Sequence, residues 1–166
     1  MTTHPNSTPY ASPAPADPTR DSTPAPVGID EFLERVRSGL DRVEAREAFA
    51  LASAGDALLV DIRYAALRER DGLIPGALVV ERNELEWRLD PWGSHRSPEA
   101  TSHDLRVVVI CNEGYASSLA AASLRQLGLH RATDLVGGFQ AWRAEGLPVI
   151  DPGIEPGIEP GIEPTV

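Results

Sequence analysis

Apolar residues along the chain form short runs and helical patterns that alternate between residues 57 and 146. Runs of a few apolar residues, several rich in β-branched side chains, predict strands at 57–63, 78–80, 106–110 and 132–136. Helical spacing, or an alanine- and leucine-rich composition, predicts helices at 29–40, 45–52, 84–89, in the segment ending at Gly128, and at 139–145. This alternation favours a layered α/β fold with a parallel sheet.

The limits of these helices are set by capping and terminating residues. Asp30 is the expected N-cap of the first helix and Asn83 that of the helix at 84–89. Gly55 and Gly146 follow helical segments and are expected to end them. Residues 64–72 are predicted to be a charged crossover with one or two helical turns. The charges on the first two helices are expected to form a solvated face.

Both ends of the chain lack the composition of a folded domain. Residues 1–27 are dense in Pro, Ser, Thr and Ala, and we expect them to be disordered because they cannot bury enough apolar surface. Residues 151–166 contain three Pro-Gly-Ile-Glu repeats and predict an extended tail. A single folded domain is therefore expected over residues 28–150.

Composition excludes several classes of function. The 166-residue chain has a formal net charge of −10, which disfavours generic binding to nucleic acid or anionic membranes. No apolar run reaches the length of a membrane span, and the first residues lack the pattern of a secretory signal. One cysteine excludes an internal disulfide and suits a reducing compartment, so a cytoplasmic location is expected. The oligomeric state stays open.

The single cysteine, Cys111, lies where the apolar run 107–110 stops. A short loop containing Gly114 follows, and then the predicted helix. A strand, a tight loop and a helix in this order direct backbone N–H groups and the positive helix end at the sulfur, which favours a nucleophilic thiolate. The alternative is a small buried hydrophobe. Because parallel sheets bind ligands at the carboxyl ends of their strands, the functional interpretation is preferred.

Other polar residues give weaker signals. Asp61 and Arg63 end the strand at 57–63, and for Asp61 an ion pair that fixes the loop is the preferred interpretation. His95 and His103 lie in a long loop without the neighbours of a metal site, so none is expected. The glycine pair at 137–138 lacks the spacing of a nucleotide-binding motif.

Several motifs, taken in order, resemble those of the rhodanese-like (sulfurtransferase) family. They are Val-Asp-Ile-Arg at 60–63, Ile-Pro-Gly-Ala at 74–77, the cysteine segment at 109–117, Gly-Gly-Phe-Gln-Ala-Trp at 137–142, and Glu-Gly-Leu-Pro-Val at 145–149. The resemblance covers about residues 57–149 and implies a single-domain member. It implies a three-layer fold in which helices flank a central parallel sheet on both faces.

The resemblance also implies a reaction. A cysteine thiolate takes sulfane sulfur from a small donor such as thiosulfate, a polysulfide or a persulfide, and passes it to an external thiol or a cyanide-like acceptor. Cys111 would carry the sulfur as a covalent persulfide, with no other cofactor and no metal. The loop that would bind the persulfide through backbone N–H groups consists of Asn112, Glu113, Gly114, Tyr115, Ala116 and Ser117. Asp61, Arg63 and Arg82 would support the site or orient substrate.

The sequence departs from the family pattern at the loop. Many active members have an arginine at the position of Ala116, and Leu73 stands where a histidine often precedes the Ile-Pro-Gly-Ala motif. Glu113 should repel a dianionic donor and oppose thiolate formation. A non-catalytic binding or redox-sensing module is therefore the alternative function. A phosphatase is not expected, because its loop would need an arginine near positions 116–118.

Overall fold

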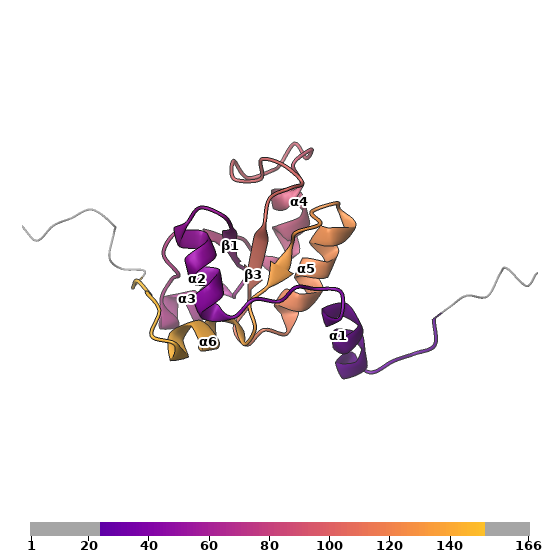
Figure 1. The fold of residues 1–166 in the computed structure, drawn as a ribbon, viewed down its shortest axis with the longest axis horizontal. Coiled ribbons are helices and arrows are strands. Elements are labelled where there is room, and N and C mark those ends of the chain that lie inside the picture. The colour runs from indigo at the N-terminus through magenta and orange to yellow at the C-terminus, as the bar shows by residue number, and fades with distance from the viewer. Residues whose placement is uncertain (1–23, 152–166) are drawn as a thin grey trace, which may run out of the picture.

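The computed structural model describes residues 24–151, and most of the two predicted tails lies outside this range. The described chain contains short strands and helices in alternation from β1 onward (Figure 1). The strands are β1 (Leu58–Asp61), β2 (Leu78–Val79), β3 (Val107–Ile110) and β4 (Thr133–Asp134). The helices are α1 (Ile29–Arg37), α2 (Ala45–Ser53), α3 (Ala65–Asp71), the 3₁₀ turn η1 (Arg82–Glu84), α4 (Leu85–Leu89), α5 (Ala116–Gln126) and α6 (Gly138–Ala144).

The four strands form one parallel sheet in the order β2-β1-β3-β4. The predicted α/β fold with a parallel sheet is therefore confirmed. Asp61 pairs with Ile110 in the register of β1 and β3, so the residues that follow these two strands emerge side by side. Cys111 thus lies at the carboxyl edge of the sheet, beside the end of β1.

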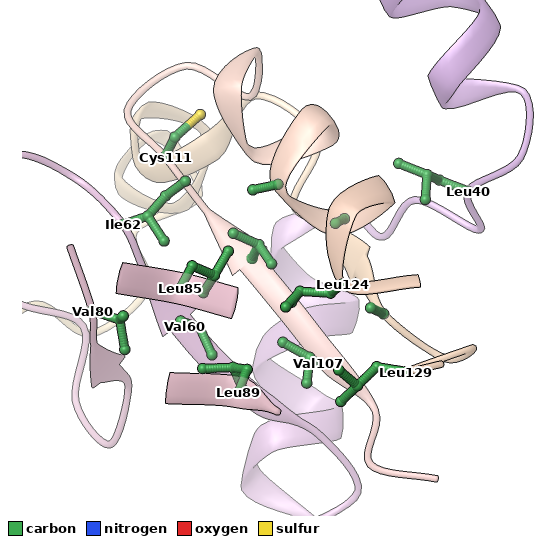
Figure 2. Packing of buried hydrophobic residues seen from close by; sticks show 14 residues of the cluster. Leu40, Val60, Ile62, Val80, Leu85, Leu89, Val107, Cys111, Leu124 and Leu129 are labelled. Carbon is green, nitrogen blue, oxygen red and sulfur yellow. The ribbon is translucent and has the colours of Figure 1, made fainter. Parts of the chain in front are cut away.

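Two hydrophobic clusters cover the two faces of the sheet. Alternate residues of β3 point to opposite faces, as in any strand. Val107 and Val109 pack in a cluster with residues of α4 and α5, whereas Val108 and Ile110 pack in a cluster with residues of α2 and α6. Figure 2 shows the first cluster, in which Cys111 lies at the edge and directs its sulfur away from the leucines. The arrangement is a three-layer one, as expected.

Helix starts differ from two sequence predictions. Gly28, not Asp30, is the N-cap of α1, because the Phe32 N–H already donates to the Gly28 carbonyl at 3.0 Å. Asp30 lies in the first turn, where a carboxylate still interacts favourably with the helix dipole. Asn83 lies inside η1, and the N-cap of α4 is Glu84.

The stretch between α1 and α2 extends the sheet beyond β4. Val43 forms a parallel bridge with Leu135, and its N–H donates to the Asp134 carbonyl at 3.2 Å. The Thr133 hydroxyl donates to the Asp41 carbonyl at 2.9 Å. These bonds hold Arg42 beside the end of β4. Within residues 24–151, no helix is both long and apolar enough to cross a membrane.

Candidate active site

The loop after β3 holds Cys111 at the start of α5. Its tight course depends on Gly114, which has φ +82°. A Cβ on Gly114 would lie 2.8 Å from the Gly137 nitrogen, so any side chain would displace the loop from the turn before α6. Glycine adopts this left-handed conformation without a steric penalty. The sequence therefore places the cysteine loop tightly against a second loop.

Backbone N–H groups point at the cysteine sulfur, as the sequence predicted. The Gly114 N–H donates to Cys111 Sγ at 3.1 Å and the Ser117 N–H at 3.4 Å. The thiol in turn donates to Ser117 Oγ, with 3.2 Å between the two atoms. The N–H groups of Glu113, Tyr115 and Ala116 have no acceptor within residues 24–151. An anion next to the sulfur can therefore find unused donors in the same loop.

Gly137 and Gly138 allow the start of α6 to pack against the cysteine loop. The Phe139 N–H donates to the Cys111 carbonyl at 2.9 Å, and the Gln140 N–H donates to the Asn112 carbonyl at 3.1 Å. A Cβ on Gly138 would overlap the Cys111 carbonyl oxygen. The glycines thus allow a close approach of two backbones, a role that the sequence analysis did not assign to them.

A pocket of about 380 Å³ opens in front of the sulfur. Cys111 is only 8% exposed but contributes to the pocket wall. The lining residues come from three carboxyl-edge segments and are mostly apolar or aromatic: Ile62, Arg63, Tyr64, Leu67, Arg82, Cys111, Asn112, Glu113, Tyr115 and Ala116. Trp92 is not among these residues and is 87% exposed.

Arg82 is held at the pocket by Glu86. Its Nη1 donates to both Glu86 carboxylate oxygens, at 3.0 and 3.1 Å, and the Ser123 hydroxyl donates to the same carboxylate at 2.6 Å. Partial burial acts to raise the pKa of Glu86, but the hydrogen bonds from Ser123 and the nearby Arg82 charge outweigh it and hold this pKa below its ordinary value. Glu86 therefore remains ionised and fixes Arg82 at neutral pH.

Asp61 and Arg63 form the ion pair that was expected for Asp61. The Asp61 carboxylate accepts from Arg63 N–H, Nε and Nη2, at 2.7–3.1 Å, and both side chains are completely buried. Nη2 of Arg63 also donates to the Gly72 carbonyl at 2.8 Å, and its guanidinium lies 3.6 Å from the Phe139 ring centroid. Nε and Nη2 are thus bound to the scaffold, whereas Nη1 is buried and has no hydrogen-bond partner within residues 24–151, and Arg63 also lines the pocket.

A second polar network lies behind the cysteine loop and was not predicted. The Asp134 carboxylate is fully buried and accepts from the hydroxyls of Ser117 and Ser118, at 3.0 and 2.8 Å. Arg42 Nε donates to Asp134 Oδ1 at 2.8 Å, and its Nη2 to Oδ2 at 3.1 Å. Arg37 Nε donates to Ser118 Oγ at 3.1 Å. The prediction of a solvated face on the N-terminal helices is therefore wrong for Arg37.

The two polar residues of β4 were the one sequence signal for this network. Thr133 and Asp134 lie between apolar residues, and an acid buried in such a strand requires partners. Its partner Arg42 lies 92 residues earlier in the chain, so spacing alone could not identify it.

Within the described residues, no cluster of three metal-ligating side chains occurs.

Comparison with known proteins identifies the class. The model of the rhodanese-like domain family matches residues 44–145, and the chain belongs to this family. A protein from Allochromatium vinosum named a sulfurtransferase is 39% identical over 102 residues, which cover 61% of this chain and 86% of that protein. The similarity therefore extends over most of the length of the Allochromatium vinosum protein.

Solved structures share the fold. A Rhodopseudomonas palustris protein of unknown function, described as a possible tyrosine phosphatase, is 34% identical with a TM-score of 0.68, covering 78% of this chain and 100% of that chain. The human single-domain sulfurtransferase is 28% identical with a TM-score of 0.54, covering 63% of this chain and 96% of that chain. Family and fold together support sulfurtransferase activity in general terms.

Proposed function

We propose that the chain moves sulfane sulfur from a small donor to a thiophilic acceptor through a persulfide on Cys111. The observation that carries this proposal is the arrangement of amide donors around Sγ at the inner end of the 380 Å³ pocket. Such donors stabilise anionic sulfur more than a neutral thiol. The reaction needs no cofactor besides the covalent persulfide.

The proposed cycle has two balanced steps. The Cys111 thiolate attacks the outer sulfur of thiosulfate, the S–S bond of the donor breaks, and sulfite leaves with the bonding electron pair. The product is Cys111–S–S⁻. We expect the N–H groups of Glu113, Tyr115 and Ala116, which have no acceptor within residues 24–151, to donate to its outer sulfur. An acceptor such as cyanide then attacks this outer sulfur, and Cys111 leaves as thiolate. A polysulfide or an organic persulfide enters by the same first step.

The pocket bears on the choice of donor. Its basic residues are the buried Arg63 and the half-buried Arg82, while the exposed Glu113 of the cysteine loop also lines it. A carboxylate at the entrance disfavours the thiosulfate dianion relative to a less charged donor. Asp61 and Arg63 act as scaffold for the loop, and Arg82 orients the anionic end of a donor. A reducing cytoplasm is the proposed compartment, because the reaction needs a free thiol.

The experiment is intact mass spectrometry of the full chain after incubation with thiosulfate, a polysulfide or an organic persulfide. Loading should add about 32 Da, the mass of one sulfur atom, and cyanide should remove it and release thiocyanate. Cys111→Ser should lose both effects. A Cys111→Ser protein that transfers sulfur at the wild-type rate would refute the proposal.

The phosphatase described for the Rhodopseudomonas palustris relative does not suit this site. Phosphoryl transfer needs a bidentate arginine at the cysteine loop. Positions 116 to 118 are Ala-Ser-Ser, and Arg125 lies more than two helical turns down α5. A binding or redox-sensing module remains the alternative, and it predicts no sulfur loading with any of the three donors.

A further inference from the structure

The cysteine loop carries no positive charge of its own. Between residues 111 and 118 the one ionised side chain at neutral pH, besides a cysteine thiolate, is that of Glu113. A thiolate or persulfide in this loop adds further negative charge, which a nearby carboxylate destabilises. Backbone N–H groups offset part of this cost. Any cationic contribution must come from residues outside the loop.

Two arginines reach the rear of the loop and share one acceptor. Arg37 Nη2 and Arg42 Nη2 both donate to the Gly114 carbonyl, at 2.8 and 3.2 Å. In a trans peptide the C=O and the following N–H point in opposite directions. The Tyr115 N–H of this peptide therefore points away from the arginines, and it has no acceptor within residues 24–151. Two charged donors on the carbonyl make this N–H a stronger donor to an anion in the loop.

Arg42 also balances the acid behind the sulfur. The Asp134 carboxylate is separated from Cys111 Sγ by only the Ser117 hydroxyl, which donates to Asp134 at 3.0 Å and accepts from the thiol at 3.2 Å. An unpaired carboxylate at this position would oppose thiolate formation. The two-point contact with Arg42 neutralises it, and the Arg42 side chain is 19% exposed, so water screens the pair only in part.

Both arginines precede the region that the family model matches, which begins at residue 44. Arg37 is the last residue of α1, which packs against α5, and Arg42 is fixed by the pairing of residues 41–43 with β4. The positions of both guanidinium groups thus depend on tertiary contacts of the N-terminal segment with the domain.

We propose that Arg37 and Arg42 are positioning residues for the sulfur site, and that they supply from behind the positive charge that the cysteine loop lacks. This inference rests on the proposed function for its biological meaning. Arg42 acts on the thiolate by balancing Asp134, and both arginines act on the persulfide by polarising the Gly114–Tyr115 peptide. The N-terminal segment is therefore part of the working site rather than an appendage.

Two variants that each remove one charge of the Arg42–Asp134 pair test the inference in the full-length protein. The readout is the rate of Cys111 alkylation by iodoacetamide near neutral pH, followed by intact mass. Arg42→Gln should slow alkylation about tenfold, because Asp134 is then unbalanced. Asp134→Asn should accelerate alkylation about threefold, because the positive charge of Arg42 is then no longer neutralised and favours the Cys111 thiolate. The double variant should return to within about threefold of the wild-type rate.

Two further variants separate charge from packing. Arg42→Lys keeps the positive charge and should restore much of the alkylation rate lost in Arg42→Gln. If Arg42→Gln does not fold, the alkylation rates of Arg42→Lys and Asp134→Asn are compared instead. Arg46→Gln is the matched control: Arg46 pairs with the exposed Glu145 and, within residues 24–151, makes no hydrogen bond or ion pair with the cysteine loop, so its alkylation rate should equal that of the wild type. Urea unfolding establishes that each variant is folded.

The outcomes are distinct. A purely structural role predicts that Arg42→Gln and Asp134→Asn both slow alkylation, and that result would overturn the inference. Wild-type alkylation in a folded Arg42→Gln protein would overturn it as well. Should the wild type accept no sulfur from any donor while the opposite signs are observed, the proposed function would fail and the action of the arginines on the thiol would be supported.

Discussion

Two buried carboxylates flank the central strand β3, and each forms an ion pair with an arginine, but the two pairs contact different parts of the molecule. Asp61 ends β1 and Asp134 ends β4, the two neighbours of β3, and neither is exposed. Each accepts two or more hydrogen bonds from one arginine. The partner of Asp61 is Arg63, two residues away, whereas Arg42 lies 92 residues from Asp134.

The difference lies in what each pair contacts next. Arg63 continues to the Gly72 carbonyl and the Phe139 ring, which belong to the scaffold. Asp134 and Arg42 continue to Ser117 and to the Gly114 carbonyl, which belong to the cysteine loop. A buried ion pair therefore indicates function only through its neighbours, and burial alone does not separate the two cases.

Removing the local pair should give the largest change in stability. Asp61→Asn leaves the fully buried Arg63 guanidinium without its counterion, and breaking such a pair costs roughly 3–5 kcal/mol of unfolding free energy. Alkylation of Cys111 in the folded molecules should change less than about twofold, because the Asp61 carboxylate accepts its hydrogen bonds from Arg63 and, within residues 24–151, from no residue of the cysteine loop. Urea titration measures the first quantity and intact mass the second.

Asp134→Asn is the control for this comparison. Its loss of unfolding free energy should be smaller, about 1.5–3 kcal/mol, because water reaches the Arg42 left behind. Its alkylation rate should rise while that of Asp61→Asn stays nearly constant. Equal effects of the two substitutions on alkylation would mean that the two pairs do not differ in function.

The same comparison explains how far the sequence could predict the molecule. The apolar run 107–110 and the cysteine after it predicted β3 and the place of the sulfur, because an apolar run and a loop–helix transition are local properties. The Asp61 pair was also anticipated, since its partner lies at i+2. Arg42 and Arg37 were assigned to solvent or left without a role, because their partners are set by tertiary contacts that one sequence does not encode locally.

Local signals also failed at helix starts. Asp30 and Asn83 have suitable side chains for N-caps, but Gly28 and Glu84 occupy those positions. In both places the backbone hydrogen bonds decide where the helix begins, and the side chain preference is worth only about 1 kcal/mol. The sequence likewise assigned no role to the glycine pair at 137–138, because the close approach of Gly138 to the Cys111 carbonyl is a tertiary contact.

A third acid, Glu113, sharpens the comparison from the pocket side of the loop. It is exposed and beside the pocket, whereas Asp134 lies buried behind the sulfur. Glu113→Gln should increase the rate of sulfur loading from thiosulfate about threefold at low salt, through reduced repulsion of the dianion. The gain should shrink toward high salt, where exposed charges are screened.

Loading from an uncharged organic donor is the internal control for Glu113→Gln, and it should change much less. A gain that persists unchanged in about 1 M salt would contradict an electrostatic cause. In that case Glu113 would act through contact with the donor and not through its charge.

A fourth carboxylate, Glu86, is intermediate between the two buried pairs. It holds Arg82 at the pocket through an i,i+4 ion pair that is partly exposed, so Glu86→Gln should cost only about 0.5–1 kcal/mol of unfolding free energy at neutral pH. The pKa of Glu86 is lowered in the folded state, so its contribution is present above the ordinary value of 4.5 and is lost as pH falls through the lowered pKa. The difference in unfolding free energy between wild type and Glu86→Gln should therefore shrink from about pH 7 to about pH 3, as urea titrations at the two values would show. A difference in unfolding free energy that does not change with pH would show that Glu86 contributes by packing instead of by its charge.

Glu86→Gln also removes the ion pair that holds Arg82 at the pocket, so the rate of sulfur loading from anionic donors should fall about twofold at neutral pH.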